Sequence, residues 1–198
     1  MILTANEKNI LRFLATRCGE EHSINEIGKL CEISPSGAHK VLLKLKKEGV
    51  LKTRNIANIK VYDLDFDGET TRSVLELAFL PEPVKGRVLF RANDVQPLRS
   101  VTKACLLFGS YSTSKRNPED MDILCIIEKK KFTTVKNVLE EVKEKTPLPV
   151  HEVLQTMNDI QKNITGKDPV VVDALQKGIV LWGAREIVEV IQTCHQKK

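Results

Sequence analysis

The sequence lacks the patterns that mark membrane, secreted and disulfide-stabilised proteins. None of its stretches reaches the run of about 18 apolar residues that a bilayer-spanning helix needs, and residues 1–8 show no signal-peptide pattern. Its five cysteines are scattered, odd in number and form no Cys-x-x-Cys pair, which argues against a disulfide framework and against a zinc site. We see no internal repeat and no low-complexity segment. We therefore expect a cytoplasmic protein with reduced thiols and no membrane contact.

The composition allows folded cores and a nucleic-acid partner without requiring the latter. The chain has 198 residues, of which 41% are hydrophobic, and this length suits one large domain or two small ones. The formal net charge of +5 is modest. Where the positive charges lie along the chain is therefore more informative than their sum.

Two apolar stretches joined by a polar loop dominate the second half of the sequence. Residues 104–108 are apolar and stop at Gly109, as expected of a buried strand closed by a glycine. Residues 111–118 are polar and predict a loop. Residues 121–127 are almost continuously apolar and predict a second central strand.

The second of these strands carries two carboxylates close to the loop. Side chains alternate along a strand, so Asp120 and Asp122 point to the same side, about 7 Å apart. Such a pair repels itself unless a cation lies between the carboxylates, and a hard ion such as Mg²⁺ prefers oxygen ligands. The turn at Gly109 and Ser110 can bring backbone N–H groups close to a phosphate. Together these features predict a site for a metal-bound nucleoside triphosphate.

Gly-Ser, a loop of about ten residues, and Asp-x-Asp leading into an apolar strand resemble the signature of the polymerase-beta-like nucleotidyltransferase superfamily, especially its small "minimal" archaeal and bacterial members. The resemblance implies a mixed sheet with helices packed on it. It also implies a triphosphate, with ATP as the expected nucleotide, held by Gly109 and Ser110. It also implies two Mg²⁺ ions bound by Asp120 and Asp122, and a third acidic residue on a later strand. The segment 178–183 resembles a short strand near the end of many such domains.

A helix over 132–144 and a strand over 150–154 follow the Asp pair. Glu152 is the only acid on that strand and, by the resemblance, is the candidate third metal-site acid; an edge-strand acid is the alternative. Its neighbour His151 points to the opposite face and is expected to be structural, and Asp159 is a weaker alternative acid. Lys115 and Arg116, in the loop, are candidates for contacts to the phosphates.

The first third of the chain predicts three helices followed by two short strands. Thr4 and Ser23 each precede a glutamate by three residues, the pattern of a capping box. Ser34 would cap a third helix with Pro35 as its first residue, and strands are expected over 50–54 and 60–64. This order, over residues 1–66, resembles the winged helix-turn-helix domains of many prokaryotic regulators.

Positive charge in this third is concentrated on the third helix and the hairpin. In winged helices the N-terminal end of the third helix enters the major groove, and outlying basic residues contact phosphates. The candidate DNA-contacting residues are Ser34, Ser36, His39, Lys40, Lys44, Lys47, Arg54 and Lys60. A solvated helix face and a protein–protein or dimerisation module remain alternatives, and a palindromic operator would imply a homodimer.

These predictions define an α+β chain with a winged helix-turn-helix over 1–66, a connector over 67–92 that includes a helix near 72–79, and a nucleotidyltransferase-like α/β domain with a mixed sheet over 93–198. In that last domain we also expect helices over 94–103, 156–164, 169–176 and 184–194.

Three functions remain open from the sequence. The first is an enzyme that transfers a nucleoside monophosphate from a triphosphate to a hydroxyl of RNA or of a protein, such as the partner toxin of a nucleotidyltransferase antitoxin. The second is a DNA-binding regulator that only senses a nucleotide. It is favoured by two departures from the family pattern, Ser114 for a frequent Gly and Glu119 for a frequent Ser. The third is an interaction module without either activity.

Overall fold

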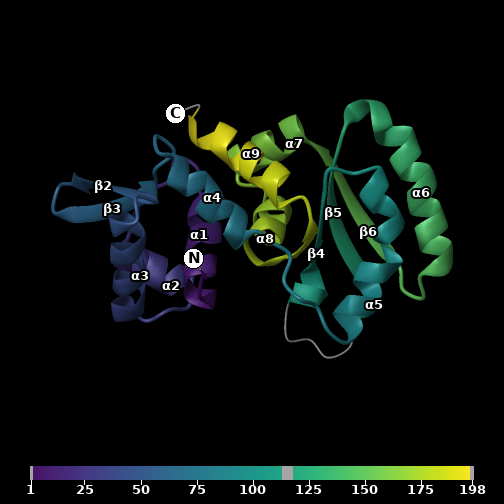
Figure 1. Cartoon of the computed structure of the whole chain (residues 1–198), viewed down its shortest axis with the longest axis horizontal. Coiled ribbons are helices and arrows are strands. Elements are labelled where there is room, and N and C mark those ends of the chain that lie inside the picture. The colour runs from purple at the N-terminus through teal and green to yellow at the C-terminus, as the bar shows by residue number, and fades with distance from the viewer. Residues whose placement is uncertain (1, 113–117, 197–198) are drawn as a thin grey trace.

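The computed structural model describes residues 2–112 and 118–196, and within them the chain is a mixed α+β fold with two sheets (Figure 1). The mixed class expected from the sequence is therefore confirmed. Among the described residues, no helix is long and apolar enough to cross a membrane. Lys115 and Arg116, expected near the phosphates, lie outside the described residues.

The N-terminal part consists of three helices packed against a small antiparallel sheet of strand order β1-β3-β2. Its elements are, in order, α1 (Ala5–Ala15), β1 (His22–Ser23), α2 (Ile24–Leu30), α3 (Pro35–Lys47), β2 (Leu51–Ile56) and β3 (Ile59–Leu64). The strand β1 was not expected from the sequence, because two residues are too few to show an alternating pattern.

Local capping signals fix where these helices begin. The Thr4 and Ser23 side chains each accept a hydrogen bond from a backbone N–H three residues later, and Glu7 and Glu26 complete both capping boxes. The Ser34 hydroxyl accepts a hydrogen bond from the backbone N–H of Gly37 at the start of α3. All three expected helix starts are confirmed.

A helical connection leads to the second sheet. It contains α4 (Glu69–Ala78), α5 (Arg87–Asp94) and the 3-10 helix η1 (Gln96–Ser100). The short helix expected over 94–103 is therefore replaced by α5 and η1. Pro97 explains part of the shift, because proline is tolerated in the first turn of a helix and not in its interior.

The C-terminal part is built around a four-stranded mixed sheet of order β6-β5-β4-β7. Strands β5 and β6 are parallel, and the other neighbouring pairs are antiparallel. Its elements after η1 are β4 (Ala104–Phe108), η2 (Gly109–Ser112), β5 (Met121–Ile127), η3 (Lys129–Lys131), α6 (Phe132–Lys145), β6 (Val150–Thr156), α7 (Met157–Thr165), α8 (Pro169–Lys177), β7 (Ile179–Trp182) and α9 (Ala184–Gln196).

Helices cover both faces of this sheet, which explains why its central strands are apolar throughout (Figure 1). One face, which includes Leu106 and Leu124, packs on α8 and α9. The opposite face, which includes Leu107 and Ile123, packs on α6 and η1. Consecutive residues of β5 therefore belong to different layers of the protein.

The hydrophobic core runs without interruption from the N-terminal helices into the second sheet. Helix α1 packs against α8, and α4 packs against α9. On α9, the buried His195 places Nε2 3.3 Å from the Ala15 carbonyl oxygen and Nδ1 3.5 Å from Asp63 Oδ1. This core cluster extends across the boundaries expected at 66 and 92, whereas the buried residues of a second cluster, which includes Leu107 and Ile123, all lie after position 92.

Candidate metal and nucleotide site

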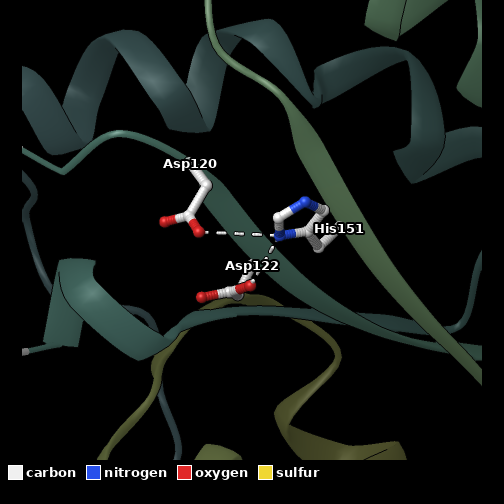
Figure 2. Close-up of side chains that lie close together, drawn as sticks. All are labelled: Asp120, Asp122 and His151. Carbon is white, nitrogen blue, oxygen red and sulfur yellow. Dashed lines mark ion pairs between the residues drawn. The ribbon is translucent and has the colours of Figure 1, made fainter.

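Asp120 and Asp122 lie at the beginning of β5, where the chain enters the central sheet, and both point to the same side of it (Figure 2). His151 of the neighbouring strand β6 lies against both carboxylates. Its Nδ1 is 3.4 Å from Asp122 Oδ1 and 3.6 Å from Asp120 Oδ2. One ligand atom from each of the three residues can be chosen so that all three atoms lie within 4.8 Å of one another.

The parallel pairing of β5 and β6 decides which residue of β6 faces the aspartates. Asp122 pairs with His151, and Ile123 pairs with Glu152. Paired residues of neighbouring strands point to the same face of a sheet, so His151 joins the aspartates and Glu152 faces the opposite layer. These positions are the reverse of those expected from the sequence, which place Glu152 beside the aspartates and His151 on the opposite face.

Glu152 is held on that opposite layer by α6. Its Oε1 lies 2.6 Å from Lys136 Nζ, and its Oε2 lies 3.1 Å from Lys143 Nζ. Burial alone would raise the pKa of Glu152, but the hydrogen bonds from Lys136, its backbone and Lys143 lower it. The structure therefore does not bring Glu152 to the aspartates. Asp159, the weaker alternative acid, completes the capping box of α7 with Thr156 and likewise lies outside the cluster.

The aspartate pair has no comparable compensation. Among the residues that the structure describes, no lysine or arginine forms an ion pair with Asp120 or Asp122. Burial raises the pKa of Asp122, the charge of Asp120 raises it further, and His151 lowers it only in part. The result is an excess of negative charge that a bound cation would relieve.

The turn after β4 closes tightly over Asp122. Gly109 has a φ of +64°, and a Cβ at this position would collide with the Asp122 carboxylate. Only glycine satisfies both conditions without strain. Gly109 and Ser110 begin the short helix η2, so the expected nucleotide-binding turn does lie beside the carboxylates.

Two arginines of α5 belong to this neighbourhood and were not anticipated from the sequence. The guanidinium carbon of Arg87 lies 5.9 Å from the ring centre of Tyr111 in η2. Burial raises the pKa of Tyr111, and the nearby charges of Arg91 and Arg87 act against this rise while Asp120 adds to it. The only sequence signal was the spacing of Arg87 and Arg91, which places them one turn apart on a helix.

The expected DNA-contacting residues of α3 are all exposed, and some of them come together. Ser36 and His39, from the first turns of α3, line a shallow groove with Lys60 and Ile59 of the β2–β3 hairpin. Ser34 caps the helix beside this groove. Residues from two expected segments, the third helix and the hairpin, therefore share one surface.

The basic residues of this part fall into two groups. Lys44 Nζ lies 2.7 Å from the buried Glu7 carboxylate, and Arg54 pairs with Glu21. Lys40, Lys47 and Lys60 form no ion pair with any residue that the structure describes. The second group is the better placed for contacts to an external phosphate, since its charges are not already neutralised.

Comparisons of the chain with protein-family models, with curated protein sequences and with solved structures found no match.

Proposed function

We propose that this protein is a metal-dependent nucleotidyltransferase, which transfers a nucleoside monophosphate from a nucleoside triphosphate to a hydroxyl of a protein or RNA acceptor and releases pyrophosphate. The observation that carries the proposal is the convergence of Asp120, Asp122 and His151 beside the Gly109 turn. Among the described residues, these carboxylates pair with no lysine or arginine. At the mouth of a tight turn, such carboxylates are better suited to hold the metal ion of a metal-bound phosphate than to form a structural ion pair.

Each residue of the site would have a distinct role in the reaction. Asp120 and Asp122 would hold the divalent metal ion that accompanies the triphosphate. When bound there, a divalent ion would supply positive charge opposite the charge that develops on the transferred phosphoryl group and would help to activate the attacking oxygen. The turn at Gly109 and Ser110 lies where backbone N–H groups can orient the triphosphate. Arg87 adds positive charge near this turn, whereas the charge of Arg91 is paired with Asp94.

The N-terminal part supports a second role in DNA binding. Its order of elements, with the β2–β3 hairpin after α3, is consistent with a winged helix-turn-helix. The groove lined by Ser36, His39 and Lys60 lies at the N-terminal end of α3, which is the end that reads the major groove in such folds. We propose that this surface binds duplex DNA.

The alternative function is a regulator whose second sheet binds a nucleotide without transferring it. One observation favours this alternative, namely that an imidazole stands beside the aspartates where a third carboxylate was expected. Both alternatives require nucleotide binding at the aspartates, so they are separated only by turnover.

The deciding experiment is incubation with each α-labelled nucleoside triphosphate, a divalent ion and cell lysate. Wild type is compared with Asp122→Asn and with Glu152→Gln, a control on the opposite face of the sheet. The proposal predicts label on an acceptor with wild type and with Glu152→Gln but not with Asp122→Asn. Metal-dependent nucleotide binding without transfer would establish the regulator instead. Absence of both binding and transfer would refute both functions.

A further inference from the structure

The candidate site contains a donor that Mg²⁺ does not favour. His151 is placed beside Asp122 by the register of two hydrogen-bonded strands, so its position follows from the backbone and not from a flexible loop. Its Nδ1 faces one oxygen of each aspartate (Figure 2). The donor set is therefore two carboxylates and one imidazole, contributed by two neighbouring strands.

The spacing of these donors fits a single ion. Ligands about 2.0–2.2 Å from one metal ion lie roughly 3–3.5 Å from each other, depending on the geometry. The two separations from His151 Nδ1, 3.4 and 3.6 Å, are close to this range, and one oxygen of each aspartate lies within 4.8 Å of one of the other. An ion could therefore contact all three residues after small side-chain rotations, without any shift of the strands.

The exposure of the three side chains is consistent with a site that still admits substrate. The Asp122 side chain is 24% exposed and that of His151 is 62% exposed. A mononuclear site with three protein ligands on an open surface leaves coordination positions for water or phosphate oxygens. A closed structural metal site would instead bury its ligands and supply a fourth one from the protein.

Donor chemistry then distinguishes between metals. Mg²⁺ prefers oxygen ligands in a nearly ideal octahedron and gives up its waters reluctantly. Imidazole nitrogen suits first-row transition metals, whereas carboxylate oxygen suits both these metals and Mg²⁺. Replacing one carboxylate by an imidazole therefore lowers the negative charge that attracts Mg²⁺ and adds a ligand that Mn²⁺, Co²⁺ and Zn²⁺ accept.

We infer that Asp120, Asp122 and His151 form a binding site for one divalent transition-metal ion of the Mn²⁺, Co²⁺ or Zn²⁺ class, and that this site selects such an ion over Mg²⁺. The inference deepens the proposed function, because it names the metal at the same aspartates. It does not depend on turnover, since metal binding is measured without nucleotide.

The test is calorimetric titration of the full-length, metal-free protein with Mn²⁺ and, separately, with Mg²⁺, in the absence of nucleotide. We expect one bound Mn²⁺ ion, with an affinity at least about tenfold higher than that of Mg²⁺. Mn²⁺ should also broaden the imidazole signals of His151 in NMR spectra. The control Glu152→Gln, altered at the next residue of β6 but on the other face, should bind both ions as wild type does.

Two substitutions at position 151 test the role of the imidazole directly. His151→Ala should weaken Mn²⁺ binding by about tenfold or more and leave Mg²⁺ binding nearly unchanged. His151→Asp should create an all-carboxylate site and move the preference toward Mg²⁺. Circular dichroism of both variants verifies that the fold is retained, which the exposure of His151 leads us to expect.

The contrary results are distinct from a failure of the proposed function. Equal affinities of wild type for Mn²⁺ and Mg²⁺, or an unchanged Mn²⁺ affinity in His151→Ala, would overturn the inference even if nucleotidyl transfer occurs with Mg²⁺. Failure to bind either ion would overturn it as well. Selective Mn²⁺ binding without any transfer would uphold the inference and refute the enzyme.

Discussion

Two groups of carboxylates lie on opposite faces of the same pair of strands and differ in how their charge is balanced. Glu152 is balanced from within the protein by Lys136 and Lys143 of α6. Within residues 2–112 and 118–196, the only basic side chain that pairs with Asp120 and Asp122 is His151. The two groups are a few residues apart in the ladder, so the difference comes from what packs on each face and not from the strands themselves.

The difference is visible in the direction of the pKa shifts. The pKa of Glu152 is lowered, because the hydrogen bonds from Lys136, its backbone and Lys143 outweigh its burial. The pKa of Asp122 is raised, because burial and the charge of Asp120 outweigh the help of His151. A carboxylate whose charged form is stabilised by lysines of the protein is expected to be structural. A carboxylate whose charged form is destabilised by its surroundings is a candidate for binding an external cation.

The largest expected effect is a loss of nucleotidyl transfer when Asp122, on the face opposite to Glu152, is replaced. Asp122→Asn keeps the size of the side chain but removes one negative charge from the proposed metal site. A bound metal contributes several kcal/mol to transition-state stabilisation, so we expect transfer to fall by roughly 10²–10³-fold. Single-turnover transfer of labelled nucleotide measures the loss. Retention of more than a tenth of the activity would place the reactive metal elsewhere.

The next largest effect is expected at Gly109, which lets the turn close over Asp122. Gly109→Ala forces a residue with a Cβ into the left-handed region of φ and makes that Cβ collide with the Asp122 carboxylate. Gly49→Ala is the matched control, because Gly49 also has a positive φ, of +73°, but open space around it.

We expect Gly49→Ala to lower the free energy of unfolding by about 1 kcal/mol, and Gly109→Ala to cost about 1–3 kcal/mol more. Urea denaturation of both variants measures the difference. Equal costs would show that the close approach of Gly109 to Asp122 contributes nothing to stability.

Much of this arrangement could be predicted from the sequence, because its signals are local. The capping boxes at Thr4 and Ser23, the strand that ends before Gly109 and the two central strands depend on neighbouring residues only. Asp120 and Asp122 share a side for the same reason, since strand alternation is a local property.

The position of His151 could not be predicted, because it depends on the register between two strands. β5 and β6 are joined through α6, and a shift of one residue in their pairing would exchange the faces of His151 and Glu152. Strand alternation places the two side chains on opposite faces, but only the register of β6 against β5 decides which of them faces the aspartates. The position of Arg87 and Arg91 could not be predicted for a similar reason, since only the tertiary fold brings α5 to Tyr111.

The same contrast between paired and unpaired charge applies to the lysines of α3 and predicts different outcomes for two variants. Lys40→Ala should reduce the salt slope of DNA binding by about one unit, as expected for one lost phosphate contact, without changing stability. Lys44→Ala should instead lower the melting temperature, because it leaves the buried Glu7 without its ion-pair partner.

Salt-dependent DNA binding and thermal unfolding of both variants provide the comparison. If Lys44→Ala changes the salt slope as much as Lys40→Ala does, the ion pair with Glu7 opens when DNA binds. The assignment of Lys44 to a structural role would then be wrong.

A smaller effect on stability is expected at Glu152. Glu152→Gln removes the charge that Lys136 and Lys143 surround and leaves the side chain nearly unchanged in shape. Both lysines remain partly exposed to solvent, so the expected loss is only about 1 kcal/mol in the free energy of unfolding. Urea denaturation should detect it, while metal titration should give the wild-type affinity. A loss of metal affinity in this variant would show that the two faces are coupled.

The smallest expected effect concerns how folding stability depends on pH. Glu152 and Asp122, on opposite faces of the sheet, should contribute to this dependence with opposite signs. The pKa of Glu152 is lower in the folded than in the unfolded chain, so its stabilising contribution is present above about pH 4.5 and is lost as the pH falls through the folded pKa. The pKa of Asp122 is higher in the folded chain, so its stabilising contribution is present below about pH 3.8 and is lost as the pH rises through the folded pKa.

In metal-free buffer, the stability lost in Glu152→Gln should therefore shrink between neutral pH and about pH 3. The stability gained in Asp122→Asn, which relieves the repulsion by Asp120, should shrink over the same interval. Urea denaturation of both variants at several pH values measures the two trends.

Saturating metal should reverse the effect of Asp122→Asn at neutral pH, because the ion stabilises the wild-type carboxylates and binds the variant more weakly. An Asp122→Asn variant that is destabilised even without metal would show that the repulsion between the aspartates is already balanced within the protein, and the contrast between the two faces would disappear.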